Sequence, residues 1–245
     1  MKKALVAFCC SVFFVFSQSV TLSQITDEER TEGFVSIFNG QDLTGWEGHP
    51  AIWRVEDGVI VGQTSAEGPA RLTYNQFLVW KGSEFDDFVL RFDIKCTRAG
   101  NSGMQFRSWI NPDATKPFSV LGYQADLDGA HTYTGIFYGE GMRGTILSQR
   151  GQETLCEPGQ RQPKEVRRFA EDAALKKELK VEDWNAYEVT AKDFTFTNKI
   201  NGHIMSIFTD SDTAIRKSSG ILAIQVHVGP PMKVEVKNMR IKKLK

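Results

Sequence analysis

The sequence predicts an all-β protein, an antiparallel β-sandwich of the jelly-roll type with one short helix. Many short stretches alternate apolar and polar residues, as strands with one buried face do. Turn-forming pairs such as Asp57-Gly58 and Asn201-Gly202 lie between stretches of this kind. Only Glu171–Leu179 combines good helix formers with an acidic start.

The predicted strands follow one another along the whole chain after its first 33 residues. In order they cover residues 34–38, a hairpin over 53–62, then 78–80, 87–97, 104–109, 123–127, 136–140, 143–147, 187–191, a hairpin over 194–208, 220–228 and 234–241. The strand over 87–97 is the clearest, because Phe88, Leu90 and Phe92 alternate there with Arg91 and Asp93. Residues 149–163 are polar and rich in Gly and Gln, which predicts a long loop.

Composition and the N-terminal pattern limit the possible partners and the location. The chain has 30 basic and 30 acidic residues, so no charge excess indicates a nucleic-acid partner. Lys2 and Lys3 precede an apolar run over 4–16, a pattern typical of a secretory signal peptide and too short to span a membrane. We therefore expect a signal peptide over 1–24, a linker or short helical turn over 25–33, one domain over 34–245, and a periplasmic or secreted protein. An uncleaved anchor is the alternative.

Two cysteines lie after the expected signal peptide. Export would allow Cys96 and Cys156 to pair. Cys96, however, lies on the apolar face of its predicted strand, so a buried free thiol fits equally well. Neither cysteine has the histidine neighbours of a zinc site.

The candidate functional residues lie on the polar faces of four predicted strands. Gln124 and Asp126 share one face of their strand, and Tyr138 and Glu140 share a face of the next. Two further polar pairs have the same spacing, Gln105 with Arg107 and Gln225 with His227. If these strands are neighbours, their amide, guanidinium and carboxylate groups could line one groove and bind sugar hydroxyls. The alternative is that these faces are simply solvated, and that His227 is structural.

Several ordered segments carry a resemblance to a known family. They are Phe38–Gly40 with Gly45-Trp46, Asp87–Arg91, Gly100–Arg107, Gly122–Asp126, Asp183–Asn185, Asn201-Gly202, Gly220–His227 and Asn238–Ile241. In this order they resemble the 3-keto-disaccharide hydrolase family, from about residue 34 to the C-terminus. The resemblance implies a concanavalin A-like sandwich. No serine-hydrolase elbow, zinc-protease helix or paired-carboxylate run competes with it.

The resemblance also implies a chemistry. A separate sugar C3 oxidoreductase would make a ketone, a base would remove the C2 proton, the enolate would expel the group on C1, and water would add. His227 would be the base, since free imidazole titrates near about 6.5. Arg107 or a divalent cation (Ca²⁺ or Mn²⁺) would hold the enolate. Asp126 and Glu140 would orient His227, protonate the leaving group or bind that ion. Sugar hydroxyls would be positioned by Asn101, Gln105, Gln124, Tyr138 and Gln225. A non-catalytic, lectin-like module is the alternative, and a conventional glucanase a weaker one.

Overall fold

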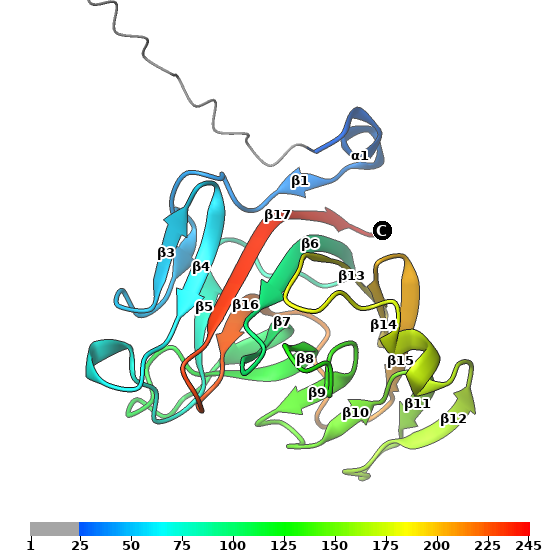
Figure 1. Cartoon of the computed structure of the whole chain (residues 1–245). Coiled ribbons are helices and arrows are strands. Elements are labelled where there is room, and N and C mark those ends of the chain that lie inside the picture. Colours follow the sequence, from blue (N-terminus) through cyan, green and yellow to red (C-terminus); the bar gives the residue numbers. More distant parts are fainter. Residues whose placement is uncertain (1–24) are drawn as a thin grey trace, which may run out of the picture.

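Two β-sheets pack face to face in the computed structural model, which describes residues 25–245 (Figure 1). The ten-stranded sheet has the order β12 (Lys164–Arg168), β11 (Gln152–Cys156), β15 (His203–Asp210), β14 (Thr195–Ile200), β13 (Asn185–Lys192), β6 (Phe88–Cys96), β17 (Lys233–Lys243), β4 (Val59–Gln63) and β3 (Trp53–Glu56), with β1 (Val35–Ser36) paired to β17. The seven-stranded sheet has the order β10 (Ile146–Ser148), β9 (Phe137–Glu140), β8 (Val120–Asp128), β7 (Asn101–Ile110), β16 (Ile221–Val226), β5 (Gln76–Trp80) and β2 (Trp46–Glu47).

The predicted class, an antiparallel jelly-roll sandwich, is confirmed. Among the described strands, the parallel pairing is that of β11 with β15. The helical elements of this part of the chain are short: α1 (Asp27–Glu32), α2 (Asp172–Lys176) and the 3₁₀ turn η1 (Gly68–Ala70). None of the helices within residues 25–245 is long and apolar enough to cross a membrane.

The core between the sheets is largely aromatic. Phe106 from β7 stacks on Tyr123 from β8, with ring centroids 5.7 Å apart, and meets the edge of Phe196 from β14 at 5.1 Å. The alternation predicted for β6 places Phe88 and Leu90 in this core, where neither has exposed surface. Such rings supply much of the buried apolar area that drives folding.

Both cysteines of the domain are buried in this core as free thiols. Burial raises the pKa of Cys96 to about 12, with a small further contribution from the charges of Asp128 and Glu182. The thiol therefore stays protonated at neutral pH and behaves as a small apolar group. Of the two possibilities left open by the sequence, the structure contains the free thiols.

The prediction of a long loop over residues 149–163 is wrong. Strand β11 lies within these residues, and β12 begins directly after them. Thr154 and Cys156 of β11 are buried, while Gln152 and Glu153 are partly exposed. The strand exists because β15 supplies a parallel partner on one side and β12 an antiparallel one on the other. This pairing is distant in sequence, and the short polar stretch gives no local sign of it.

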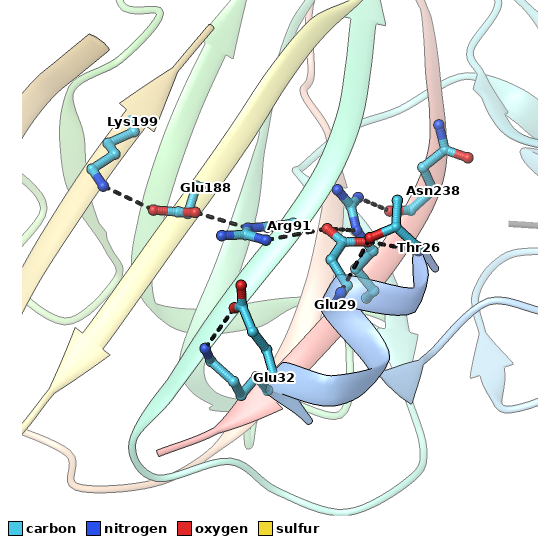
Figure 2. A network of polar contacts seen from close by, with 9 residues as sticks. Thr26, Glu29, Glu32, Arg91, Glu188, Lys199 and Asn238 are labelled. Atoms are coloured by element: carbon cyan, nitrogen blue, oxygen red, sulfur yellow. Dashed lines mark hydrogen bonds and ion pairs between the residues drawn. The ribbon is translucent and has the colours of Figure 1, made fainter. Parts of the chain in front are cut away.

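Residues 25–33 were expected to form a linker or a short helical turn. They contain the short helix α1, which is tied to the outer face of the ten-stranded sheet. Thr26 caps the helix, accepting a hydrogen bond from Glu29 N, while the Glu29 carboxylate accepts one from Thr26 N. The same carboxylate accepts hydrogen bonds from Arg91 of β6 at 3.1 Å and Arg240 of β17 at 2.7 Å (Figure 2).

This network continues across two more strands. Arg91 also donates to Glu188 of β13 at 2.8 Å, and Lys199 of β14 donates to the other Glu188 oxygen at 3.0 Å (Figure 2). Burial by itself would raise the pKa of Glu29, but the hydrogen bonds and charge of Arg240, with Thr26 N and Arg91, outweigh it and lower that pKa. Glu29 is therefore ionised and forms the centre of the network.

Replacing Glu29 should destabilise the domain more than replacing its neighbour Glu32. We expect Glu29→Gln to lower the free energy of unfolding by about 1–3 kcal/mol, because two arginines lose their shared carboxylate. Glu32→Gln is the matched control, because its side chain is 38% exposed and, within residues 25–245, forms its ion pair with Lys242. Its effect should stay below about 1 kcal/mol.

Urea unfolding at several pH values measures both effects. A lowered native pKa means that the Glu29 contribution is present above the ordinary glutamate pKa of 4.5 and is lost as pH falls through the native value. The gap between wild type and Glu29→Gln should therefore close in acid. Equal effects of the two substitutions at neutral pH would contradict this role for α1.

Candidate active site

A pocket of about 430 Å³ opens on the face of the seven-stranded sheet that points away from the core. Seven of the nine predicted site residues line it: Asn101, Gln124, Asp126, Tyr138, Glu140, Gln225 and His227. The lining also includes four residues not predicted as site residues: Asn75, Tyr133, Ile136 and Ile146. Its volume is within the range typical of small-molecule sites, roughly 300–1,000 Å³.

The alternation of β8 accounts for the position of the two central polar residues. Tyr123, Ala125 and Leu127 lie in the core and are at most 2% exposed. Gln124 and Asp126 therefore point to the opposite face, as the pattern predicts. Because β8 lies between β7 and β9 in the sheet, their side chains stand near the middle of the pocket.

A chain of side-chain hydrogen bonds runs across this face. Ser108 Oγ donates to Gln105 Oε1 at 2.7 Å, and Gln105 Nε2 donates to Gln124 Oε1 at 2.6 Å. Gln124 reaches across β7 because residue 103 is glycine: a Cβ there would lie 2.7 Å from Gln124 Cγ. Gln105 itself has no exposed surface and is not among the residues that line the pocket. It therefore supports Gln124 from behind rather than contacting a ligand as predicted.

The chain ends on the two carboxyl groups. Gln124 Nε2 donates to Asp126 Oδ1 and, at 3.3 Å, to Gln225 Oε1. Gln225 Nε2 lies 3.4 Å from Glu140 Oε2, and Asn75 Nδ2 lies 3.3 Å from Glu140 Oε1. An ionised carboxylate only accepts hydrogen bonds, so each amide has its nitrogen directed toward a carboxyl group.

Both carboxyl groups hold their protons more tightly than usual. Burial raises the pKa of Asp126 well above its ordinary value; the Gln124 hydrogen bond opposes this, and the charges of Glu140 and Asp128 reinforce it. Burial also raises the pKa of Glu140. The hydrogen bond from Asn75, the charge of His227 and the hydrogen bond from Gln225 lower this pKa but do not outweigh burial. Two carboxyl groups with raised pKa values in one pocket are candidate proton donors.

His227 lies just past the end of β16 and lines the same pocket, with its ring only partly buried. Its Nδ1 is 2.6 Å from the Val228 carbonyl oxygen. A carbonyl oxygen only accepts, so Nδ1 carries the hydrogen and Nε2 keeps a free lone pair in the neutral ring. This assigned tautomer is the form that can accept a proton at Nε2.

Arg107 does not reach the pocket, which corrects its expected role at the enolate. β7 contains a β-bulge between Phe106 and Trp109, and Arg107 has a positive φ of 43°. The extra residue reverses the alternation, so Arg107 turns toward the sandwich interior and has no exposed surface. Its guanidinium donates to Asp87 Oδ1 at 2.6 Å and to the Asp86 and Asp193 carbonyl oxygens at 2.9 and 2.5 Å.

Within residues 25–245, no group of three or more His, Cys, Asp or Glu side chains is arranged to hold a metal ion. Asp126, Glu140 and His227 line one pocket but are not grouped as ligands of one ion.

Substituting Asp126 should change the pH dependence of stability. Because its pKa is raised, the native state binds the proton more tightly, and stability falls as pH rises from the unfolded value of 3.8 through the native one. Asp126→Asn removes this loss. We expect equal melting temperatures at pH 4, and at pH 8 a variant that is more stable than wild type by about 1 kcal/mol or more.

Thermal melts at both pH values make this comparison. Asp113→Asn, at a loop carboxylate with a side chain 40% exposed, is the control and should show no such gain. A fall in the melting temperature of Asp126→Asn at pH 8 would instead mark the ionised carboxylate as a structural partner.

Arg107→Met should destabilise the fold by about 2–4 kcal/mol, because the acceptors on Asp86, Asp87 and Asp193 lose their donor. Turnover per folded molecule should stay unchanged, since the side chain lies outside the pocket. Chemical unfolding and an assay on the folded protein separate the two effects. A large loss of kcat in fully folded protein would return Arg107 to the site.

Comparisons with known proteins identify the family and the fold of the chain. The model of a family described as the 3-keto-alpha-glucoside-1,2-lyase-like domain matches residues 33–242. The chain belongs to this family. Its resemblance to the 3-keto-disaccharide hydrolases is thereby confirmed, and the chain is of a carbohydrate-active, glycosidase-like type.

Solved structures share the fold. A candidate glycosyl hydrolase from Parabacteroides distasonis is 24% identical, covering 91% of this chain and 100% of that one, with a TM-score of 0.59. A second protein so described from the same organism is 15% identical, with 86% and 99% covered and a TM-score of 0.54. The carbohydrate-binding module CBM66 from Bacillus subtilis is 15% identical, with 81% and 96% covered and a TM-score of 0.50. A search among curated proteins finds no match.

Proposed function

We propose that this protein cleaves glycosides whose sugar carries a ketone at C3, by removing the C2 proton, eliminating the group on C1 and adding water. The observation that carries the proposal is that Asp126, Glu140 and His227, from three separate segments, line one pocket. The family description, a 3-keto-glucoside lyase-like domain, supports the same chemistry.

The first step is removal of the C2 proton. The C3 ketone acidifies the C2–H bond, and His227 Nε2 accepts the proton while the electron pair moves onto the C3 oxygen. Asp126 in its protonated form donates a hydrogen bond to that oxygen. The raised pKa of Asp126 favours this protonated form. A buried carboxylic acid can stabilise an enolate in this way. Asp126 thus takes the role that the sequence analysis gave to Arg107.

The second step is elimination, and the third is hydration. The enolate collapses to the ketone, the C1–O bond breaks and a C1=C2 double bond forms. The departing oxygen takes a proton from Glu140, whose raised pKa suits a general acid. Water then adds across the double bond. The ionised Glu140 takes one of its protons as its oxygen bonds to C1, and the protonated His227, whose proton exchanges with solvent, gives a proton to C2. Both groups are thereby restored, and the net change is hydrolysis. Amides of Asn101, Gln124 and Gln225 bind the remaining hydroxyls.

The proposal includes the cellular setting. The residues that would direct export, 1–24, lie outside the part that the structure describes, and we propose from their sequence that the protein is periplasmic or secreted. The C3 ketone would come from a separate sugar C3 oxidoreductase, because this reaction neither creates nor consumes an oxidant.

The direct test is incubation with 3-keto-trehalose or a 3-keto-glucoside while free leaving group is measured. The second candidate function is carbohydrate binding without catalysis, since an amide-rich pocket on this sandwich would bind sugar hydroxyls in either case. Saturable binding with no product at any pH, with and without added Ca²⁺ or Mn²⁺, would favour it. Release of reducing ends from unoxidised laminarin would instead indicate a conventional glucanase.

His227→Ala should lower kcat/KM by about a hundredfold or more, because the reaction loses its base. His203→Ala is the matched control: that histidine is 49% exposed, pairs with Glu178 and lies outside the pocket. Steady-state kinetics with a 3-keto-glucoside give both values. Equal activity of the two variants would remove His227 from the mechanism.

A further inference from the structure

Asn75 lies directly opposite His227 in the seven-stranded sheet. The antiparallel ladder between β5 and β16 ends with the pair Gln76 and Val226. One step further, the same register brings Asn75 opposite His227, just beyond the ends of both strands. Side chains directly opposite one another in an antiparallel pair lie on the same face of the sheet, and both residues line the pocket. Asn75 is therefore a direct neighbour of the proposed base.

The side-chain amide of Asn75 contacts two groups at once. Its Oδ1 accepts a hydrogen bond from Val228 N at 3.0 Å, and its Nδ2 lies 3.3 Å from Glu140 Oε1. A backbone N–H only donates and an ionised carboxylate only accepts, so both contacts favour the same orientation of the amide. One side chain thus connects the segment that carries His227 with the carboxyl group of Glu140.

The contact with Val228 fixes the backbone next to the imidazole. Strand β16 ends at Val226, so His227 and Val228 follow the last residue of the ladder. Asn75 Oδ1 accepts from the N–H of the peptide group that joins His227 to Val228, and the Val228 carbonyl oxygen in turn lies 2.6 Å from His227 Nδ1. Asn75 therefore holds the backbone whose carbonyl group sets the tautomer with a free Nε2.

The contact with Glu140 spans the pocket. Three strands separate β9, which carries Glu140, from β5, which Asn75 precedes. Burial raises the pKa of Glu140, and the hydrogen bond from Asn75 is the strongest of the effects that lower it, ahead of the charge of His227. Asp126 of β8 and Tyr138 of β9 also face Glu140, and its charge helps to raise their pKa values. Asn75 thus stabilises the ionised form of Glu140 across the pocket.

We propose that Asn75 is a positioning residue that holds Glu140 and His227 at a fixed separation, as one hydrogen-bonded unit. The inference rests on the proposed function, in which His227 removes the C2 proton and Glu140 protonates the oxygen that leaves C1. These two proton transfers take place at neighbouring carbon atoms of one ring, so the base and the acid must stand at a matching distance. Displacement of a reacting group by about 1 Å can lower a rate about a hundredfold.

Two substitutions separate the contacts of Asn75. Asn75→Leu keeps the approximate shape of the side chain and removes both hydrogen bonds. Asn75→Asp keeps an acceptor for Val228 N but places a second carboxylate beside Glu140. With a 3-keto-glucoside as substrate, we expect Asn75→Leu to lower kcat by about ten- to a hundredfold with little change in KM. The alkaline limb of the kcat/KM profile should move to higher pH in Asn75→Leu, and further in Asn75→Asp, because Glu140 then keeps its proton to a higher pH.

A second readout needs no substrate. Titration of the Glu140 carboxyl group by ¹³C NMR, assigned with Glu140→Gln, measures its pKa directly. Removing the hydrogen bond to the ionised form should raise this pKa in Asn75→Leu, and the added charge should raise it further in Asn75→Asp. Asn111→Leu is the matched control and should change neither readout. Its amide likewise donates to a side chain, Ser119 Oγ at 3.2 Å, and accepts from a backbone N–H, that of Asp113 at 3.0 Å, but lies outside the pocket.

The outcomes separate the two proposals. An unchanged Glu140 titration in both Asn75 variants would overturn the positioning role, and so would a fall in kcat no larger than that of Asn111→Leu. Either result leaves the proposed function in place, because the wild type still turns over its substrate. No turnover of the 3-keto-glucoside by wild type would contradict the proposed function and the positioning role with it.

Discussion

The hydrogen-bond chain from Gln105 through Gln124 to Gln225 is the interaction on which the candidate site depends. Three glutamine side chains with at most 2% exposure would destabilise a sheet unless their amides were paired. Here each amide accepts from the previous group and donates to the next, and the donors end on Asp126 and Glu140. The same bonds that make this polar face stable therefore also place two protonatable carboxyl groups in one pocket.

Local sequence patterns predicted the parts of the fold that depend on one strand at a time. Alternation placed the Gln124 and Asp126 side chains opposite the core, because a strand with one buried face has a period of two. It failed at Arg107, because a bulge adds a residue to β7 while β8 and β16 keep theirs. The bulge arises from the pairing of β7 with its two neighbouring strands. The pattern of residues along β7 alone therefore does not predict it.

Tyr133 and Glu29 were not identified from the sequence, because hydrogen bonds to other segments or residues, and not a periodic pattern, determine the position of each. Tyr133 lies in a polar loop with no periodicity, and its fixed position requires Asp128 and Arg150 together. Glu29, in the segment expected to form a linker or a short helical turn, likewise acquires its role from Arg91 and Arg240, which lie 62 and 211 residues away. His227 was identifiable because a histidine in a strongly apolar strand is unusual, although only the structure places it beside the carboxyl groups of the pocket.

The proposed reaction requires the C2 hydrogen of the sugar to leave during catalysis, and an experiment in deuterated water detects this loss. The reaction is run in D₂O, and the 3-keto-glucose product is analysed by mass spectrometry and NMR, with preformed product incubated alongside to correct for spontaneous exchange. Elimination followed by hydration predicts one solvent deuterium on C2 of the enzymatic product. Release of product that retains its original C2 hydrogen would contradict the account, because the glycosidic bond would then have been broken by direct hydrolysis.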